Sequence, residues 1–151
     1  MLPARLFALS LTVLLFAVSG CGSGQRTVTK AEYQAQLAAS SQAIRAAGQE
    51  LGKSRTVADL NGGVSGFQDA LRAGEKKLNR LEPPADARAA NKHLAHAFGD
   101  LADALESVKS ADTMVKAQLA LGRIGNSTAI KEGQAAIAEL NRLGYSGAAA
   151  P

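Results

Sequence analysis

The spacing of apolar residues along most of the chain is that of one face of an α-helix, with apolar positions three or four residues apart. The first stripe of this kind consists of Tyr33, Leu37, Ile44 and Leu51. Just before it, Thr29 and Glu32 have the spacing of a capping box, in which a hydroxyl and a carboxylate each bind a free backbone amide at a helix start. The pattern predicts a first helix over residues 30–53.

The second periodic segment starts with the same capping pattern, formed by Thr56 and Asp59. From Val57 to Leu81 its apolar residues step by three or four positions without a slip. Glycines at 62, 63 and 66 lie within this run, although each costs about 1 kcal/mol relative to alanine inside a helix. Because the register continues across them, we predict one helix over residues 56–82. Close packing against a neighbouring helix explains the glycines, and a hinge is the alternative.

Two prolines, Pro83 and Pro84, end the second helix and suit the first turn of a third, predicted over residues 85–109. Its apolar face holds Leu94, Phe98, Leu101, Leu105 and Val108. Asp112 can cap a fourth helix over residues 112–143. The apolar phase of that helix changes at residues 125–128, so we expect a kink or a break there. Gly144 ends it, and residues 145–151 are predicted to form a disordered tail.

Four amphipathic helices joined by short loops can bury their apolar stripes only against one another. Abundant alanine and few β-branched residues also favour helix over sheet. We therefore predict an all-α fold, an antiparallel up-and-down four-helix bundle over residues 29–144. A flexible Gly- and Ser-containing linker, residues 21–28, precedes it.

The amino-terminal segment has the order of a secretory signal peptide, with one positive charge at Arg5 before twelve largely apolar residues, 6–17. This run is shorter than the roughly 20 residues that a transmembrane helix needs, so we expect residues 1–20 to be cleaved. The residues before Cys21 are Val18, Ser19 and Gly20. The sequence VSGC resembles the lipobox of bacterial lipoproteins.

That resemblance implies a diacylglyceryl lipid on the Cys21 thiol and cleavage between Gly20 and Cys21. An ordinary signal peptide followed by a free thiol is the alternative. Cys21 is the only cysteine of the chain, so it cannot form a disulfide within it, and an exported free thiol would be open to oxidation. Two acyl chains at this position would give stable membrane attachment.

The remainder of the chain resembles small helical lipoproteins of high-GC Gram-positive bacteria at the pattern level, through LEPPADARAA at residues 81–90 and LNRLGY at residues 140–145. The resemblance implies a lipid-anchored domain on the extracytoplasmic face of the cell membrane. Gly22, rather than an aspartate, follows Cys21, which is compatible with the outer membrane in a host that has two membranes. Fold similarity of this kind carries no function with it.

The charge balance is mildly positive, with 17 Lys and Arg against 13 Asp and Glu. Such a balance suits anionic lipid headgroups or envelope polymers. With two tyrosines and no tryptophan, the chain cannot build the aromatic platform that binds single-stranded nucleic acid, so we expect no nucleic-acid partner.

Two polar clusters are candidate binding sites. His93, His96, Asp100 and Asp103 are spaced 3, 4 and 3 apart and share one helix face that could hold zinc or another divalent ion. The alternative is a solvated polar face, because this stripe is offset from the apolar seam. The second cluster is a basic stretch: Arg72, Lys76, Lys77 and Arg80. It is either a solvated face or a contact for anionic lipid or wall polymer.

The sequence holds no nucleophile elbow, phosphate-binding glycine loop, haem-attachment motif or recognisable pair of catalytic carboxylates. We therefore expect a non-enzymatic module without a cofactor, whose partners are the membrane, through the lipid, and another envelope protein. A small-ligand or metal-binding bundle is the alternative, and a spacer is a third possibility. A closed core favours protein binding, whereas an apolar cavity with converging polar groups favours a ligand.

Overall fold

The computed structural model describes residues 27–146, so the predicted signal peptide 1–20, Cys21 and residues 147–151 lie outside the described part. Its regular elements are all helical, in this order: α1 Lys30–Gly52, α2 Val57–Arg80, the short 3₁₀ helix η1 Ala85–Ala87, α3 Arg88–Ala104, α4 Glu106–Lys109, α5 Met114–Gly125 and α6 Thr128–Arg142. The predicted all-α fold class is confirmed.

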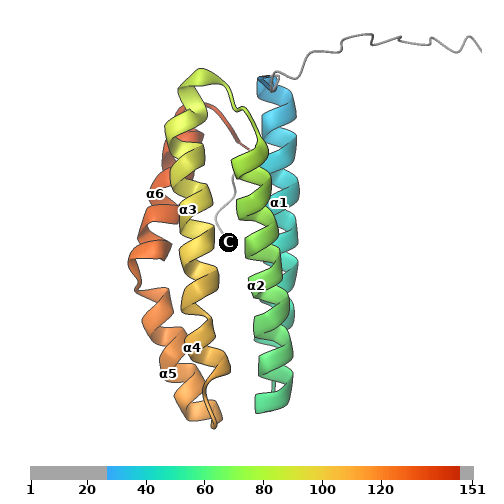
Figure 1. Ribbon diagram of the computed structural model, residues 1–151, viewed down its shortest axis with the longest axis vertical. Helices are drawn as coiled ribbons and strands as arrows, with labels where there is room; N and C mark the ends of the chain where they lie inside the picture. The colour runs from blue at the N-terminus through green and yellow to red at the C-terminus, as the bar shows by residue number, and fades with distance from the viewer. Residues whose placement is uncertain (1–26, 147–151) are drawn as a thin grey trace, which may run out of the picture.

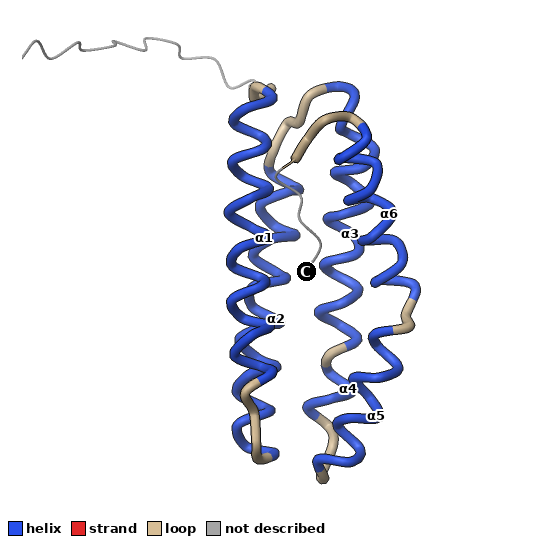
Figure 2. The backbone as a smooth tube through the Cα atoms, turned by 180° about the vertical axis from the view of Figure 1, so that it is seen from behind, coloured by secondary structure: helices blue, strands red, loops and turns tan. Residues whose placement is uncertain are grey.

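The helices form an elongated bundle in which the long helices lie side by side, while α4 continues the line of α3 and α6 that of α5 (Figures 1 and 2). Helix α1 packs on α2, α2 on α3, and α3 on α6, while α4 and α5 form the corner at the end far from residue 27. Short connections reverse the chain direction between these long helices, which is the arrangement that short loops impose on amphipathic helices.

The first two helices begin as predicted, each at a complete capping box. Thr29 accepts a hydrogen bond from the Glu32 amide, while the Glu32 carboxylate accepts one from the Thr29 amide. Thr56 and Asp59 repeat this arrangement before α2. Helix α2 continues without a break across its glycines, and its observed bounds differ from the predicted ones by one or two residues.

The third predicted helix, 85–109, is divided in the structure into η1, α3 and α4, with Leu105 between α3 and α4. The Ser107 hydroxyl donates to the Ala104 carbonyl, which a continuous α-helix would use for the Val108 amide. The Val108 amide instead bonds to the Leu105 carbonyl, which tightens this turn. Leu105 and Val108 remain buried, so the interruption does not disturb the apolar seam.

The predicted break in the fourth helix is confirmed, because α5 ends at Gly125 and α6 begins at Thr128. Ser127 caps α6 by accepting from the Ile130 amide, and the Asn126 side chain bonds to the Gly122 carbonyl. The predicted cap at Asp112 is wrong: Thr113 caps α5, and the Asp112 carboxylate pairs with Lys116 instead.

The core consists of two clusters of buried side chains, one at each end of the bundle. The cluster near residue 27 includes Tyr33, Leu78, Leu94 and Leu140, and the other includes Leu71, Leu105, Val108 and Ile124. Phe98 packs against both clusters, so the core is continuous along the bundle.

A buried polar network lies within the first cluster. Tyr33 on α1 donates its hydroxyl to Asn91 Oδ1 at 3.0 Å, and Asn91 on α3 donates its amide to the Leu78 carbonyl at 3.1 Å. That carbonyl belongs to the last turn of α2, and it also accepts a hydrogen bond from the Leu81 amide at 3.3 Å. Asn91 is 6% exposed, so both hydrogen bonds satisfy groups that water does not reach.

The prediction that residue 145 belongs to a disordered tail is wrong, because Tyr145 is buried. Gly144 has φ +79°, and the Tyr145 and Gly144 amides bond to the Leu140 and Asn141 carbonyls. This is the Schellman arrangement, which turns the chain back at a helix end. The Tyr145 ring packs edge-on against Tyr33, with ring centroids 5.3 Å apart.

The predicted linker is also shorter than expected at its carboxyl end. The Val28 amide donates to the Glu82 carbonyl at 2.9 Å, and the Val28 side chain packs against the first core cluster. The chain therefore enters the bundle beside the carboxyl end of α2.

Close helix packing explains one of the glycines in α2. A Cβ atom at Gly63 would lie 2.9 Å from the Leu51 Cα on α1, whereas a Cβ at Gly66 would have no neighbour within 4 Å. Gly63 therefore serves the contact between α1 and α2, as predicted for these glycines, while Gly66 faces open space.

These two positions give a matched test of the helix contact. We expect Gly66→Ala to raise the free energy of unfolding by about 0.5–1 kcal/mol, because alanine favours helix over glycine. We expect Gly63→Ala to lower it by about 1–2 kcal/mol, because the strain of overpacking against backbone exceeds that gain. Urea unfolding measures both, and equal effects of the two substitutions would contradict the packing.

Candidate functional site

The metal-ligating side chains that meet in the structure come from two helices, α3 and α6. His96 Nδ1 lies 3.0 Å from Asp100 Oδ2 and 3.9 Å from Glu132 Oε2. The three ligand atoms all lie within 4.8 Å of one another, and the three residues are exposed. We refer to His96, Asp100 and Glu132 as the α3–α6 cluster.

The close packing of α6 on α3 explains why these three side chains lie together. His96 and Asp100 are four residues apart on α3, which places them on one side of the helix. Beside them, Ala97 packs against Gly133 of α6, where a Cβ on the glycine would lie 3.5 Å from the Ala97 Cβ. Small residues at this contact let the two helices approach closely, and Glu132 is thereby brought to His96.

The other two predicted ligands do not join the cluster. The Asp103 carboxylate pairs with Arg72 of α2 instead. His93 lines a hollow of about 260 Å³ between α3 and α6, together with Glu132, Glu139 and alanines 89, 90, 135 and 136. The structure therefore brings His96 and Asp100 together with Glu132, whereas the partner of Asp103 lies across the α2–α3 contact.

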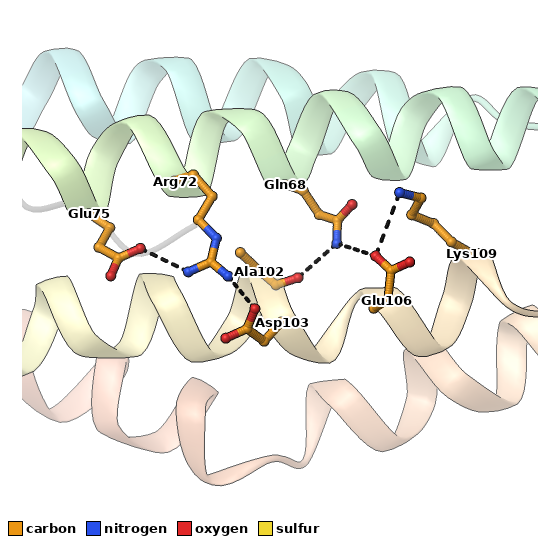
Figure 3. Close-up of polar contacts among 7 residues, drawn as sticks. All are labelled: Gln68, Arg72, Glu75, Ala102, Asp103, Glu106 and Lys109. Carbon is orange, nitrogen blue, oxygen red and sulfur yellow. Dashed lines mark hydrogen bonds and ion pairs between the residues drawn. The ribbon is translucent and has the colours of Figure 1, made fainter.

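A row of polar contacts runs along the contact between α2 and the helices α3 and α4 (Figure 3). Gln68 donates to the Ala102 carbonyl at 2.9 Å and to Glu106 at 3.3 Å. Arg72 binds Glu75 at 3.0 Å and also Asp103. The hydrogen bond to Glu75 raises the pKa of the Arg72 guanidinium, and the Asp103 charge raises it further.

Of the predicted basic surface, Arg72 belongs to this row of contacts, and Lys76, Lys77 and Arg80 do not. Arg72 is engaged by two carboxylates, so it is not available to an anionic surface in the way that the sequence indicated. Lys76, Lys77 and Arg80 make no ion pair or hydrogen bond with another described residue. They lie in the last two turns of α2, next to the point where the chain enters the bundle.

Helix α5 carries the large apolar side chains that the described part of the chain exposes. Val115 and Leu119 are 67% and 60% exposed. They lie four residues apart, and Gly122 follows at the next turn, so the three form one stripe, which we call the α5 apolar edge. Next to it is a hollow of about 290 Å³, lined on α5 by Lys116, Leu119, Ala120 and Arg123 and before α5 by Ser107, Ser110 and Ala111.

The other surface hollows differ in lining. One of about 510 Å³ lies at the α1–α2 end and is lined by Glu50, Lys53, Asp59 and glycines 62, 63 and 66, among others. An apolar one between α3 and α6, beside Phe98 and Ile130, measures only about 110 Å³. Sites for small organic ligands are mostly apolar and hold about 300–1,000 Å³, so neither hollow combines the lining and the volume of such a site.

Sequence reasoning missed Glu132 and the α5 apolar edge. Glu132 belongs to a different helix from the histidines, and no local spacing connects the two. Val115 and Leu119 are out of phase with Met114, Leu121 and Ile124, and this mismatch was the available signal for an exposed apolar stripe.

Comparisons of the chain with protein families, with curated proteins and with solved structures gave no match. Within residues 27–146, no helix has both the length and the apolar content needed to cross a bilayer.

Proposed function

We propose that this protein is a lipid-anchored, extracytoplasmic helical module that acts without catalysis by binding another envelope protein through the α5 apolar edge. The observation that carries the proposal is the exposure of Val115 and Leu119 on one stripe of α5. Exposed apolar surface beside polar residues is typical of protein-binding surfaces.

The surroundings of the edge specify the chemistry of the partner. Lys116 and Arg123 flank Leu119, and the adjoining hollow is lined by small side chains. In residues 27–146, Arg123 has no ion-pair partner. Lys116 already pairs with Asp112. The fitting partner is therefore a protein segment that inserts an apolar side chain and presents a carboxylate to Arg123.

The proposed lipid attachment is supported by the place where the chain enters the bundle. Val28 follows Cys21 by seven positions, which limits the distance between their Cα atoms to about 25 Å. A lipid on Cys21 would hold the Lys76, Lys77 and Arg80 end of α2 within this reach of the membrane, where positive charge suits anionic headgroups. In a one-membrane host this is the outer surface of the cell membrane; in a two-membrane host the outer membrane is compatible.

Mass spectrometry of protein purified from its native host tests the attachment. We expect an amino-terminal Cys21 that carries a diacylglyceryl group and lacks residues 1–20. We also expect Cys21→Ser to move the protein out of the membrane fraction, because the acyl chains supply the attachment. An unmodified thiol, or a retained leader at steady state, would remove this part of the proposal.

Site-specific photocrosslinking in intact cells tests the binding edge. A photoreactive residue at Leu119 is expected to give one discrete adduct with another envelope protein, and a Val115→Glu substitution in the same chain should abolish it. The matched control is the same residue at Ala39, an exposed position on α1, which should give no such adduct. Crosslinking to a second copy, or equal adducts at both positions, would contradict the proposed partner.

A further inference from the structure

The two carboxylates of the α3–α6 cluster differ from nearby carboxylates in the groups that they pair with. Glu75, Asp103 and Glu139 each pair with an arginine. Within residues 27–146, Asp100 and Glu132 have no lysine or arginine partner, and each faces the His96 imidazole instead. Two carboxylates therefore converge on an imidazole nitrogen without a lysine or arginine beside them.

The distances suit a single ion. In a tetrahedral zinc site, bonds of about 2.1 Å place neighbouring ligand atoms about 3.4 Å apart. The ligand atoms of His96, Asp100 and Glu132 lie within 4.8 Å of one another, with His96 Nδ1 at 3.0 and 3.9 Å from the two carboxylate oxygens. All three side chains are exposed, so small rotations can bring them to these positions without changing the backbone.

The ligand types indicate which ion fits. Imidazole nitrogen is a ligand for zinc and related transition metals, whereas magnesium and calcium favour sites built of oxygen alone. Three protein ligands leave one tetrahedral position for water, which is the composition of open zinc sites.

We propose that His96 and Asp100 of α3 and Glu132 of α6 bind one divalent transition-metal ion of the zinc type. The ion would join α3 to α6 in the second turn of α6, shortly after the break between α5 and α6. Its binding would therefore hold α6 in place on α3 independently of any protein partner or lipid anchor. The proposal does not rest on the function proposed above.

Zinc titration by calorimetry tests the site, using the untagged full chain with Cys21→Ser so that no thiol competes for the ion. We expect one zinc ion per chain, and loss of the binding heat in Glu132→Gln and in His96→Ala. Asp103→Asn and His93→Ala are the matched controls on the same helix, and both should bind zinc as the parent does.

Thermal unfolding with and without zinc gives a second readout. The unfolding midpoint of the parent should rise with zinc concentration, because a ligand that binds only the folded chain stabilises it, while that of Glu132→Gln should not respond. Absence of zinc binding by the parent would overturn the proposal. Binding that survives Glu132→Gln, or that is lost in Asp103→Asn, would overturn the assignment of these three ligands.

Discussion

The relative positions of the first three helices depend on a buried hydrogen-bond network centred on Asn91. Its side chain accepts from the Tyr33 hydroxyl of α1 and donates to the Leu78 carbonyl of α2. Because a buried polar group without a partner costs free energy, only one register of the three helices satisfies all these atoms. Tyr145 extends the network, since its ring contacts Tyr33 and its hydroxyl donates to Asp86 at 2.8 Å.

This network lies at the end of the bundle where the chain enters, and the candidate binding surfaces lie further along it. With α3 fixed against α1 and α2, its outer face presents His96 and Asp100 to α6. The α5 apolar edge lies at the opposite end (Figure 1). Helix α1 spans 23 residues, or about 35 Å at 1.5 Å per residue, so the bundle would hold that edge well away from a membrane at its entry end.

The features that were predicted correctly from the sequence depend on residues that are close together in the chain. The capping boxes at Thr29 and Thr56 and the break before Thr128 depend on residues within one or two turns, and they lie where the sequence placed them. The burial of Tyr145 and the meeting of Glu132 with His96 depend on contacts between distant segments, which no single-helix pattern records. The pairing of Asp103 with Arg72 was not predicted for the same reason, because Arg72 lies on another helix.

The most direct test of the central network is a spectrophotometric titration of its two tyrosines, which are the only ones in the chain. Burial, and secondarily the charge of Tyr145, raises the pKa of Tyr33; burial and the hydrogen bond to Asp86 raise the pKa of Tyr145 to about 12. The unfolded chain loses these protons near pH 10, so stability is full below that pH and falls as pH rises toward 12. We predict that phenolate absorbance appears only well above pH 10, together with loss of helical circular dichroism. Ionisation of both tyrosines near pH 10 in a chain that keeps its helices would contradict the network.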